Sequence, residues 1–226
     1  MSTSPAPAKP SASVVIVRDG HESLEILMLR RNEKIAFHGG AWVFPGGRVD
    51  DIDGTHGADT ELEVAKRAAV RETLEETGLD VSFEAMLPFA HWTTPVQLPK
   101  RFATWFFAAP ARGNVDVRID NSEIIDYRWL TPAAALDMHK QGELELPAPT
   151  YITLLGFTPL ASVAGLVAHL RGAQVQRFVP RLVPIASGRC TVYAEDASYE
   201  TLEFDTPGPR HRLIMTGHDW RYIREF

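Results

Sequence analysis

This sequence contains one cysteine, Cys190, in 226 residues. A single thiol excludes an internal disulfide framework and is typical of a protein kept in a reducing cytoplasm. A basic excess is also missing: 23 Lys and Arg stand against 29 Asp and Glu, and the net charge of −6 argues against nucleic acid or an anionic membrane as a partner. Long apolar runs are absent, and residues 1–12 are rich in Pro, Ala and Ser, so we expect a flexible tail there and neither a signal peptide nor a membrane span.

The order of apolar segments predicts an α+β fold. Residues 13–18 and 24–29 are short apolar runs around an Asp-Gly turn signal, which predicts a pair of strands. A helix is expected over residues 132–139, where Thr131 is a suitable N-cap. Further strand-like segments, rich in aromatic and β-branched residues, cover residues 81–92, 101–109 and 124–130. This order predicts a mixed sheet between helices.

Residues 63–79 form the stretch with the most chemical content. Its Ala-rich middle favours a helix, and Gly78 suits a C-terminal cap. On such a helix Glu72, Glu75 and Glu76 lie on one face, because they are spaced at i, i+3 and i+4. Three carboxylates on one face suit a hard divalent cation that bridges to substrate phosphates. The alternative is a solvated charged face of an ordinary surface helix.

The full string decides between these interpretations. From Arg71 to Leu79 the chain reads R-E-T-L-E-E-T-G-L, and Glu63 precedes Arg71 with seven residues between them. The string resembles the signature of the Nudix hydrolases, G-x5-E-x7-R-E-U-x-E-E-x-G-U, where U is aliphatic. The match departs at Thr73, a polar residue in the place of the first U.

The front of the signature is interrupted. Gly57 satisfies the G-x5-E spacing to Glu63, but we interpret this as coincidence, because the typical Pro-Gly-Gly turn ends far upstream at Gly47. Residues 48–62 are therefore predicted to contain a loop insertion. Surface loops tolerate insertions at little cost, so we expect its acidic residues to point outward into solvent. These residues are Asp50, Asp51 and Asp53.

The resemblance implies a fold, a cofactor and a set of site residues. It implies a Nudix-like mixed β-sheet sandwiched between helices over residues 13–141. Residues 142–226 lie outside the resemblance, and we expect them to form a C-terminal α/β extension packed on the same domain. The resemblance also implies a hydrolase that uses Mg²⁺ or Mn²⁺. By resemblance, Glu75 and Glu76 are primary metal ligands, Glu72 is a ligand or the base, Gly46 offers its carbonyl oxygen, Glu123 is a later ligand, and Glu63 and Arg71 fix the helix and loop.

The substrate implied by the resemblance is a nucleoside diphosphate linked to another moiety. The turn also resembles part of a coenzyme A diphosphatase motif, R-x3-G-x3-F-P-G-G, although Ala36 stands in the place of its arginine. Arg30 and Arg31 are the nearest replacements and are either solvated or bound to phosphate oxygens. Coenzyme A or an acyl-coenzyme A is the first choice, while a nucleotide sugar, a dinucleoside polyphosphate and an oxidised nucleotide stay open. A non-catalytic Nudix-fold protein that senses a nucleotide is the alternative.

The C-terminal extension carries no motif. One or two helices are expected over residues 151–170, interrupted at Pro159. A β-meander is expected in the segments that follow, at residues 190–194, 201–204 and 211–215, with an aromatic tail at 220–222. The sequence leaves open whether this part completes the sheet, forms the surface of a homodimer or covers the active site.

Overall fold

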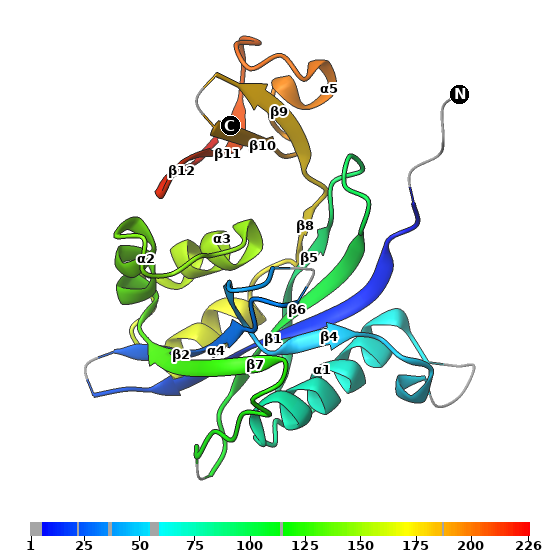
Figure 1. The fold of residues 1–226 in the computed structure, drawn as a ribbon, viewed down its shortest axis with the longest axis vertical. Helices are drawn as coiled ribbons and strands as arrows, with labels where there is room; N and C mark the ends of the chain where they lie inside the picture. The colour runs from blue at the N-terminus through cyan, green and yellow to red at the C-terminus, as the bar shows by residue number, and fades with distance from the viewer. Residues whose placement is uncertain (1–5, 22, 36–37, 55–58, 114, 187) are drawn as a thin grey trace.

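The computed structural model describes residues 6–21, 23–35, 38–54, 59–113, 115–186 and 188–226. Eight described strands form one mixed sheet, with α1 on one face and α2, α3 and α4 on the other (Figure 1). The predicted α+β sandwich is confirmed. The strands of this sheet are β1 (Lys9–Asp19), β2 (Leu24–Arg31), β3 (Trp42–Val43), β4 (Gly46–Arg48), β5 (Leu87–Thr93), β6 (Phe102–Pro110), β7 (Ile124–Leu130) and β8 (Gln176–Phe178).

The main path of this sheet runs in the order β3-β2-β1-β6-β5-β8, while β4 pairs with β1 and β7 pairs with β2. A second sheet of four strands follows in the order β12-β11-β10-β9. The remaining elements are η1 (Asp51–Asp53), α1 (Glu61–Thr77), α2 (Pro132–Lys140), α3 (Ala148–Phe157), α4 (Val163–Arg171), β9 (Arg181–Ile185), β10 (Gly188–Val192), α5 (Ser198–Thr201), β11 (Arg210–Thr216) and β12 (Asp219–Glu225).

β1 lies at the centre of the large sheet and divides its two cores. Alternate residues of a strand point to opposite faces, so Val14 and Ile16 pack on the α1 side, while Val15 and Val17 pack on the side of α2, α3 and α4. β1 pairs antiparallel with β2 and parallel with β6. The pairing with β6 begins at Lys9, so the predicted tail is wrong over residues 9–12, which are held by backbone hydrogen bonds of the sheet.

Other predicted elements agree with the structure in part. The strand over 124–130 and the break between two helices near Pro159 are confirmed. The strand expected over 81–92 begins only at Leu87. The strand expected over 201–204 is wrong, because this segment leaves the short helix α5 through a left-handed residue, Leu202, with φ of 58°.

Helix α1 ends at Gly78 as its sequence predicts, and it begins with a cap at Thr60. The side chain of Thr60 accepts a hydrogen bond from the backbone N–H of Glu63, and Gly78 ends the helix with φ of 68°. The apolar Leu74 of α1 is 55% exposed, whereas the polar Thr73 beside it is fully buried. The Oγ1 atom of Thr73 has no hydrogen-bond partner among the described residues.

This buried hydroxyl gives a stability prediction. Thr73→Val keeps the shape of the side chain and removes a buried polar atom that has no partner, so the free energy of unfolding should rise by about 1 kcal/mol or more. Thr77→Val is the matched control, because Thr77 is equally buried but donates to the carbonyl of Thr73 at 2.6 Å and accepts from Leu79 N–H. The control should lose stability. Urea unfolding of both variants measures the difference, and equal shifts would contradict it.

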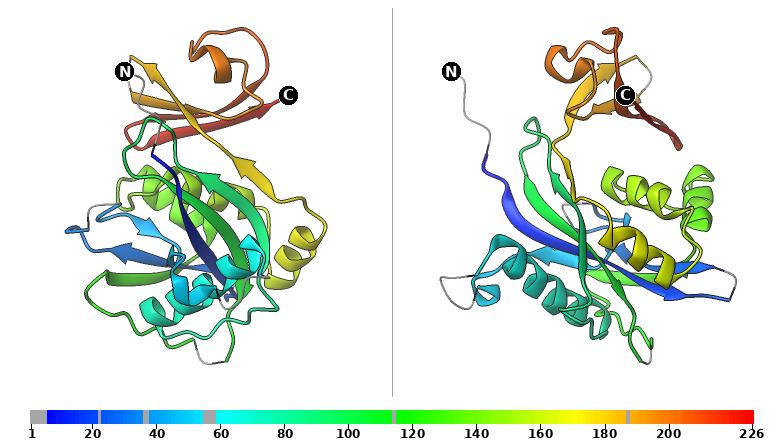
Figure 2. Two further views of the ribbon diagram at one scale, coloured as in Figure 1. Left: turned by 90° about the vertical axis from the view of Figure 1, so that its right-hand side faces the viewer. Right: turned by 180° about the vertical axis from the view of Figure 1, so that it is seen from behind.

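The C-terminal sheet packs on the side of α2, α3 and α4. Tyr193 and Leu213 belong to the same core as Trp92, and the hydroxyl of Tyr151 donates to the carbonyl of Trp220 at 2.9 Å. Figures 1 and 2 show this sheet at the end of the molecule away from α1. Of the three roles left open by the sequence, a cover over the carboxylates of α1 is therefore excluded in this arrangement. In the described part of the chain, no helix has the length and apolar character needed to span a membrane.

Candidate active site

The turn after β3 brings the backbone against the C-terminal half of α1. The N–H of Gly46 donates to Oε2 of Glu76 at 2.9 Å. Gly46 has φ of 147°, and a Cβ there would lie 2.3 Å from the carbonyl oxygen of Ala12. A Cβ at Gly47 would lie 2.3 to 2.5 Å from the carboxyl atoms of Glu72. The missing side chain lets Gly46 lie against the backbone of β1 and lets the carboxylate of Glu72 reach Gly47.

The carboxylates at this turn are buried and crowded. Glu76 is 7% exposed, and burial raises its pKa to about 8, with a further increase from the nearby charge of Glu72. The pKa of Glu72 is also raised, chiefly by burial and further by Glu75 and Glu123, while Arg71 opposes the change. Both shifts have the cause expected when carboxylates share a poorly solvated space. Glu123, which the sequence placed in a later loop, is therefore close to the helix carboxylates.

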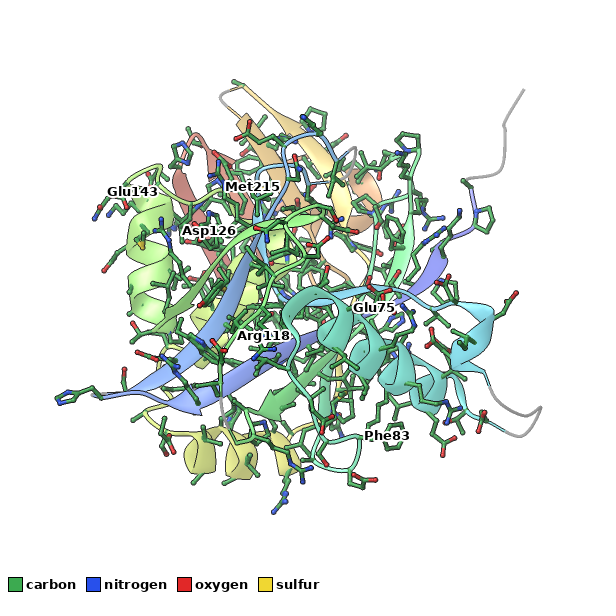
Figure 3. The ribbon with its side chains drawn as sticks, turned by 60° about the horizontal axis from the view of Figure 1, so that its bottom comes forward. Glu75, Phe83, Arg118, Asp126, Glu143 and Met215 are labelled. Atoms are coloured by element: carbon green, nitrogen blue, oxygen red, sulfur yellow. The ribbon has the colours of Figure 1, made fainter. Side chains whose placement is uncertain are left out.

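Arg71 connects the insertion to these carboxylates. Its Nε and Nη2 donate to the two carboxyl oxygens of Asp53 at 3.0 and 2.9 Å, a bidentate pair. Its Nη1 donates to Glu72 at 2.9 Å and to Glu75 at 3.3 Å. The side chain of Glu75 is 58% exposed and lies on the outer side of α1 (Figure 3). Arg71 therefore has a bidentate anchor at Asp53, donates also to the carbonyl of Arg48 at 3.0 Å, and has two carboxylate partners on the helix.

Asp53 itself is 3% exposed. Burial would raise the pKa of its carboxyl, but the hydrogen bonds from Arg71 and from the backbone N–H of Asp50 outweigh burial and lower it. The prediction that the acidic residues of the insertion all point into solvent is wrong for this residue. A buried carboxylate needs a partner, and Arg71 supplies it.

Two further residues of the predicted signature lie at or near the loop. The carboxylate of Glu63 accepts a hydrogen bond from the backbone N–H of Thr60 at 2.8 Å in a capping box and so fixes the start of α1. Gly57 lies outside the described residues. Asp53 lies six positions after Gly47, where G-x5-E counted from the Pro-Gly-Gly turn has its glutamate. This count, read with Asp in place of Glu, was the signal that could have identified Asp53.

The two arginines of β2 lie on opposite faces of the sheet. Arg31 forms an ion pair with Glu123 and lies near enough to Glu76 to lower the pKa of that carboxyl against the effect of burial. The side chain of Arg31 is 16% exposed, and its Nε atom is buried with no hydrogen-bond partner among the described residues. Arg30 lies opposite Trp42 in the β2–β3 pair, on the side of α2, α3 and α4, and forms an ion pair with Glu33 at 2.9 Å. Of the two arginines of β2, Arg31 is therefore the one beside the carboxylates.

The donor set suits a hard divalent cation. Carboxylate oxygens are the ligands that Mg²⁺ and Mn²⁺ prefer, and the raised pKa values of Glu72 and Glu76 mark a place where added positive charge is stabilising. Among the described residues, however, no three His, Cys, Asp or Glu side chains are arranged around a common point that could hold a metal ion. Glu72 and Glu75 instead face Arg71. The choice of ligands among Glu72, Glu75, Glu76, Glu123 and the carbonyl of Gly46 stays a prediction.

The turn, the helix and its arginine lie within a region with known relatives. The model of the NUDIX domain family matches residues 7–149, well over half of the chain. The chain belongs to the NUDIX family. The predicted resemblance is thereby confirmed, and the match extends to the first turn of α3, past the end of the range expected from the sequence.

Curated relatives of this NUDIX protein are distant. "Putative nudix hydrolase 7" of Caenorhabditis elegans is 24% identical over 159 residues, which cover 55% of this chain and 52% of the relative, so the chain spans about half of that protein. "Acyl-coenzyme A diphosphatase NUDT19" of Xenopus laevis is 22% identical over 305 aligned positions, covering 84% of this chain and 80% of the relative. "Peroxisomal coenzyme A diphosphatase ndx-8" of C. elegans is 34% identical over 67 residues, which are 30% of this chain and 25% of the relative.

Solved structures share the NUDIX fold. A NUDIX hydrolase from Alicyclobacillus acidocaldarius superposes with a TM-score of 0.66 at 20% identity and covers 72% of this chain and 96% of its own. The NUDIX domain of Shewanella oneidensis NrtR, complexed with ADP ribose, gives a TM-score of 0.52 at 14% identity, over 66% of this chain and 86% of its own. At these identities the likeness concerns the fold.

Proposed function

We propose that this protein is a pyrophosphohydrolase that cleaves the diphosphate linkage of a nucleoside diphosphate compound with the help of Mg²⁺ or Mn²⁺. The observation that carries the proposal is a pair of carboxylates, the buried Glu76 and the partly buried Glu72, held against the Gly46-Gly47 turn with pKa values raised by burial. Carboxylates in such a place are costly for a fold and are typical of functional sites. Membership of the NUDIX family supports the same activity.

Each residue near the turn has a part in this proposal. Glu76, Glu72 and Glu123 would hold the cation, with Glu75 and the Gly46 carbonyl as further ligands. When bound, the cation supplies charge neutralisation for the phosphates and lowers the pKa of a water molecule. Glu72 is the candidate to accept the proton of the attacking water, because its raised pKa brings it nearer to neutral pH. The anchored Arg71 limits how far Glu72 and Glu75 can move.

Arg31 is the residue proposed to bind the substrate. It is beside the carboxylates, and its buried Nε–H has no hydrogen-bond partner among the described residues, so one donor stays available while another binds Glu123. A phosphate oxygen would satisfy that donor, and Arg binds phosphate with two or more N–H groups. Arg30, the other arginine expected to bind substrate, lies on the opposite face and is already paired with Glu33. We therefore assign the phosphate contact to Arg31 alone.

For the substrate class we propose coenzyme A or an acyl-coenzyme A. Two relatives carry coenzyme A diphosphatase names, and one of these, ndx-8, aligns at 34% identity over a short segment. Gly40, Phe44 and the following Pro-Gly-Gly match the turn of the coenzyme A motif. Ala36, in the place of the arginine of that motif, lies outside the described residues. Arg31 would take over the contact with the anionic part of the substrate.

A mass-spectrometric screen tests the activity and the substrate together. The purified protein is incubated with coenzyme A, an acyl-coenzyme A, ADP-ribose, a nucleotide sugar and a dinucleoside polyphosphate, each with and without Mg²⁺ or Mn²⁺. We expect metal-dependent cleavage between the two phosphorus atoms of coenzyme A. Turnover of another compound only would overturn the substrate class, and binding without turnover of any compound would favour the nucleotide-sensing alternative.

The two arginines of β2 provide a matched pair of variants. Arg31→Ala should lower kcat/KM for coenzyme A by roughly ten- to a hundredfold, because a charge-assisted contact in a partly buried site is worth about 1.5 to 3 kcal/mol. Arg30→Ala should change it by less than about threefold, because Arg30 lies on the opposite face of the sheet and forms its ion pair with an exposed glutamate. Steady-state kinetics on coenzyme A and on a smaller nucleoside diphosphate compound separate the outcomes. Equal losses in the two variants would remove the assignment of Arg31.

A further inference from the structure

β12 forms one edge of the C-terminal sheet. Its inner side pairs with β11 from Arg210 opposite Glu225 to Thr216 opposite Asp219, and no strand of the described residues pairs with its outer side. An edge strand presents N–H and C=O groups that can bind another strand. On β12 the carbonyl of Trp220 already accepts a hydrogen bond from the hydroxyl of Tyr151. The segment D-W-R-Y-I-R-E has no proline or lysine, which commonly protect such edges.

The symmetry of a dimer limits how two such edges can pair. Two copies that join through the same edge of β12 run antiparallel and are related by a two-fold axis perpendicular to the sheet. Rotation about this axis leaves the two faces of the sheet in place. A side chain on one face of the first copy therefore lies opposite a side chain on the same face of the second copy. Successive side chains point to opposite faces, so a residue can lie opposite only itself or a residue an even number of positions away. The axis must therefore pass between one residue and its own copy. Three positions of the axis pair five or more residues of β12 with the second copy. These positions are at Arg221, Tyr222 and Ile223.

Charge selects one of these three registers. An axis at Arg221 places this arginine opposite its own copy. An axis at Tyr222 places Asp219 opposite Glu225, which are both acidic. An axis at Ile223 places no like charges together and sets Arg221 opposite Glu225 twice, once on each side of the axis. Like charges directly opposite destabilise a strand pair, and unlike charges stabilise it. Only the register centred on Ile223 is therefore favourable.

The state of these side chains agrees with that register. Arg221 and Glu225 are exposed, and the structure describes no side-chain hydrogen bond or ion pair for either of them. Arg210, opposite Glu225 on β11, donates instead to the carbonyl of Thr206 at 2.6 Å. Phe226, which is 66% exposed, would lie opposite Trp220 of the second copy. Both unpaired charges gain a partner in this register, whereas the ring of Phe226 already lies against His211 and Arg224 of its own chain.

We propose that β12 is the interface of a homodimer, in which two copies of this chain pair antiparallel about Ile223 and join their four-stranded C-terminal sheets into one continuous sheet. The second copy is preferred over another partner because the strand is complementary to itself in charge. The proposal does not depend on the hydrolytic activity, and its tests do not measure turnover.

Disulfide cross-linking tests the register directly. Residues directly opposite in antiparallel strands have Cα atoms about 4.5 to 5.5 Å apart, within the range that a disulfide spans. Ile223→Cys should therefore give a covalent dimer on mild oxidation. Arg221→Cys is the matched control, because its two copies would be separated by about 13 Å along the strands. The native Cys190 is fully buried and does not compete. Equal cross-linking of the two variants, or none of Ile223→Cys, would overturn the proposal.

Charge exchange gives an independent test by sedimentation velocity. Arg221→Glu and Glu225→Arg each place like charges together twice and should weaken self-association by about tenfold or more. The double variant exchanges the two charges and should return to within about threefold of the wild type. Arg171→Glu, an exposed arginine of α4, should have no effect. Thermal unfolding checks that each variant is folded. A wild type that is monomeric at every concentration, or a double variant as weak as the single ones, would refute the interface.

Discussion

Glu76→Gln is expected to lose metal-dependent turnover by well over tenfold while the protein stays folded. The amide has nearly the shape of the carboxylate and still accepts the hydrogen bond from Gly46 N–H, so the turn should be kept. It removes a negative charge from a buried place beside Glu72 and should make the metal-free protein at least as stable as the wild type. A hydrolysis assay at saturating Mg²⁺ measures the first effect, and thermal unfolding without metal measures the second.

Two controls make the result specific to Glu76. Glu143→Gln is the same change at an exposed carboxylate and should leave both quantities unchanged. Added Mg²⁺ should raise the melting temperature of the wild type more than that of Glu76→Gln, because a ligand stabilises the state that binds it. This readout does not depend on the substrate. If the variant kept more than a tenth of the wild-type kcat, a loss below about 1.4 kcal/mol in the barrier, Glu76 would not be a metal ligand.

The parts of the fold that sequence predicted are those fixed by local signals. Helix α1 was predicted because its alanines and its final Gly78 act within one helix. β7 was predicted with its observed bounds, because an apolar and aromatic run precedes a clear N-cap at Thr131. These elements need little information from the rest of the chain.

The errors have a common physical cause: they depend on partners that are distant in sequence. Residues 9–12 look like a polar tail, but β6, about ninety residues later, supplies a strand for them to pair with. Leu202 and Phe204 alternate as in a strand, but they pack on the small core around Cys190 from outside the C-terminal sheet. Apolar alternation alone cannot distinguish these cases.

The residues of the candidate site also fall into those predicted from local spacing and those brought together by contacts distant in sequence. The spacing of Glu72, Glu75 and Glu76 on one helix is local, and the sequence identified it. The approach of Arg31 and Glu123 to these carboxylates depends on the pairing of β2 with β7 and was predicted only by resemblance. Asp53 was predicted to point into solvent, because its partner Arg71 lies eighteen residues away and no sequence pattern predicts the conformation of the loop between them.

Asp53→Asn is accordingly predicted to lower the stability of the protein strongly. If Asp53 pointed into solvent, the same change would have little effect. The bidentate pair with Arg71 is charge-assisted, and Asp53 is nearly fully buried, so its loss should lower the free energy of unfolding by about 1.5 to 3 kcal/mol. Asp51→Asn is the matched control: it makes the same change two residues away, at an exposed position of η1. Urea unfolding should show a loss for Asp53→Asn alone.

The variant should also bind metal more weakly, and this separates a positioning residue from a purely structural one. Without the Asp53 carboxylate, the guanidinium of Arg71 loses its bidentate partner and keeps the carbonyl of Arg48, the more distant Asp50, and Glu72 and Glu75 on the helix. Its charge then competes more strongly with a cation for the helix carboxylates. We expect the Mg²⁺ concentration for half-maximal activity to rise by about tenfold, a change of about 1.4 kcal/mol in binding, and excess Mg²⁺ to restore most of kcat. Asp53→Glu, which keeps the charge, should recover part of the metal affinity. A variant that loses stability but keeps the wild-type Mg²⁺ dependence would show that the Asp53–Arg71 pair serves the fold and leaves the metal site unaffected.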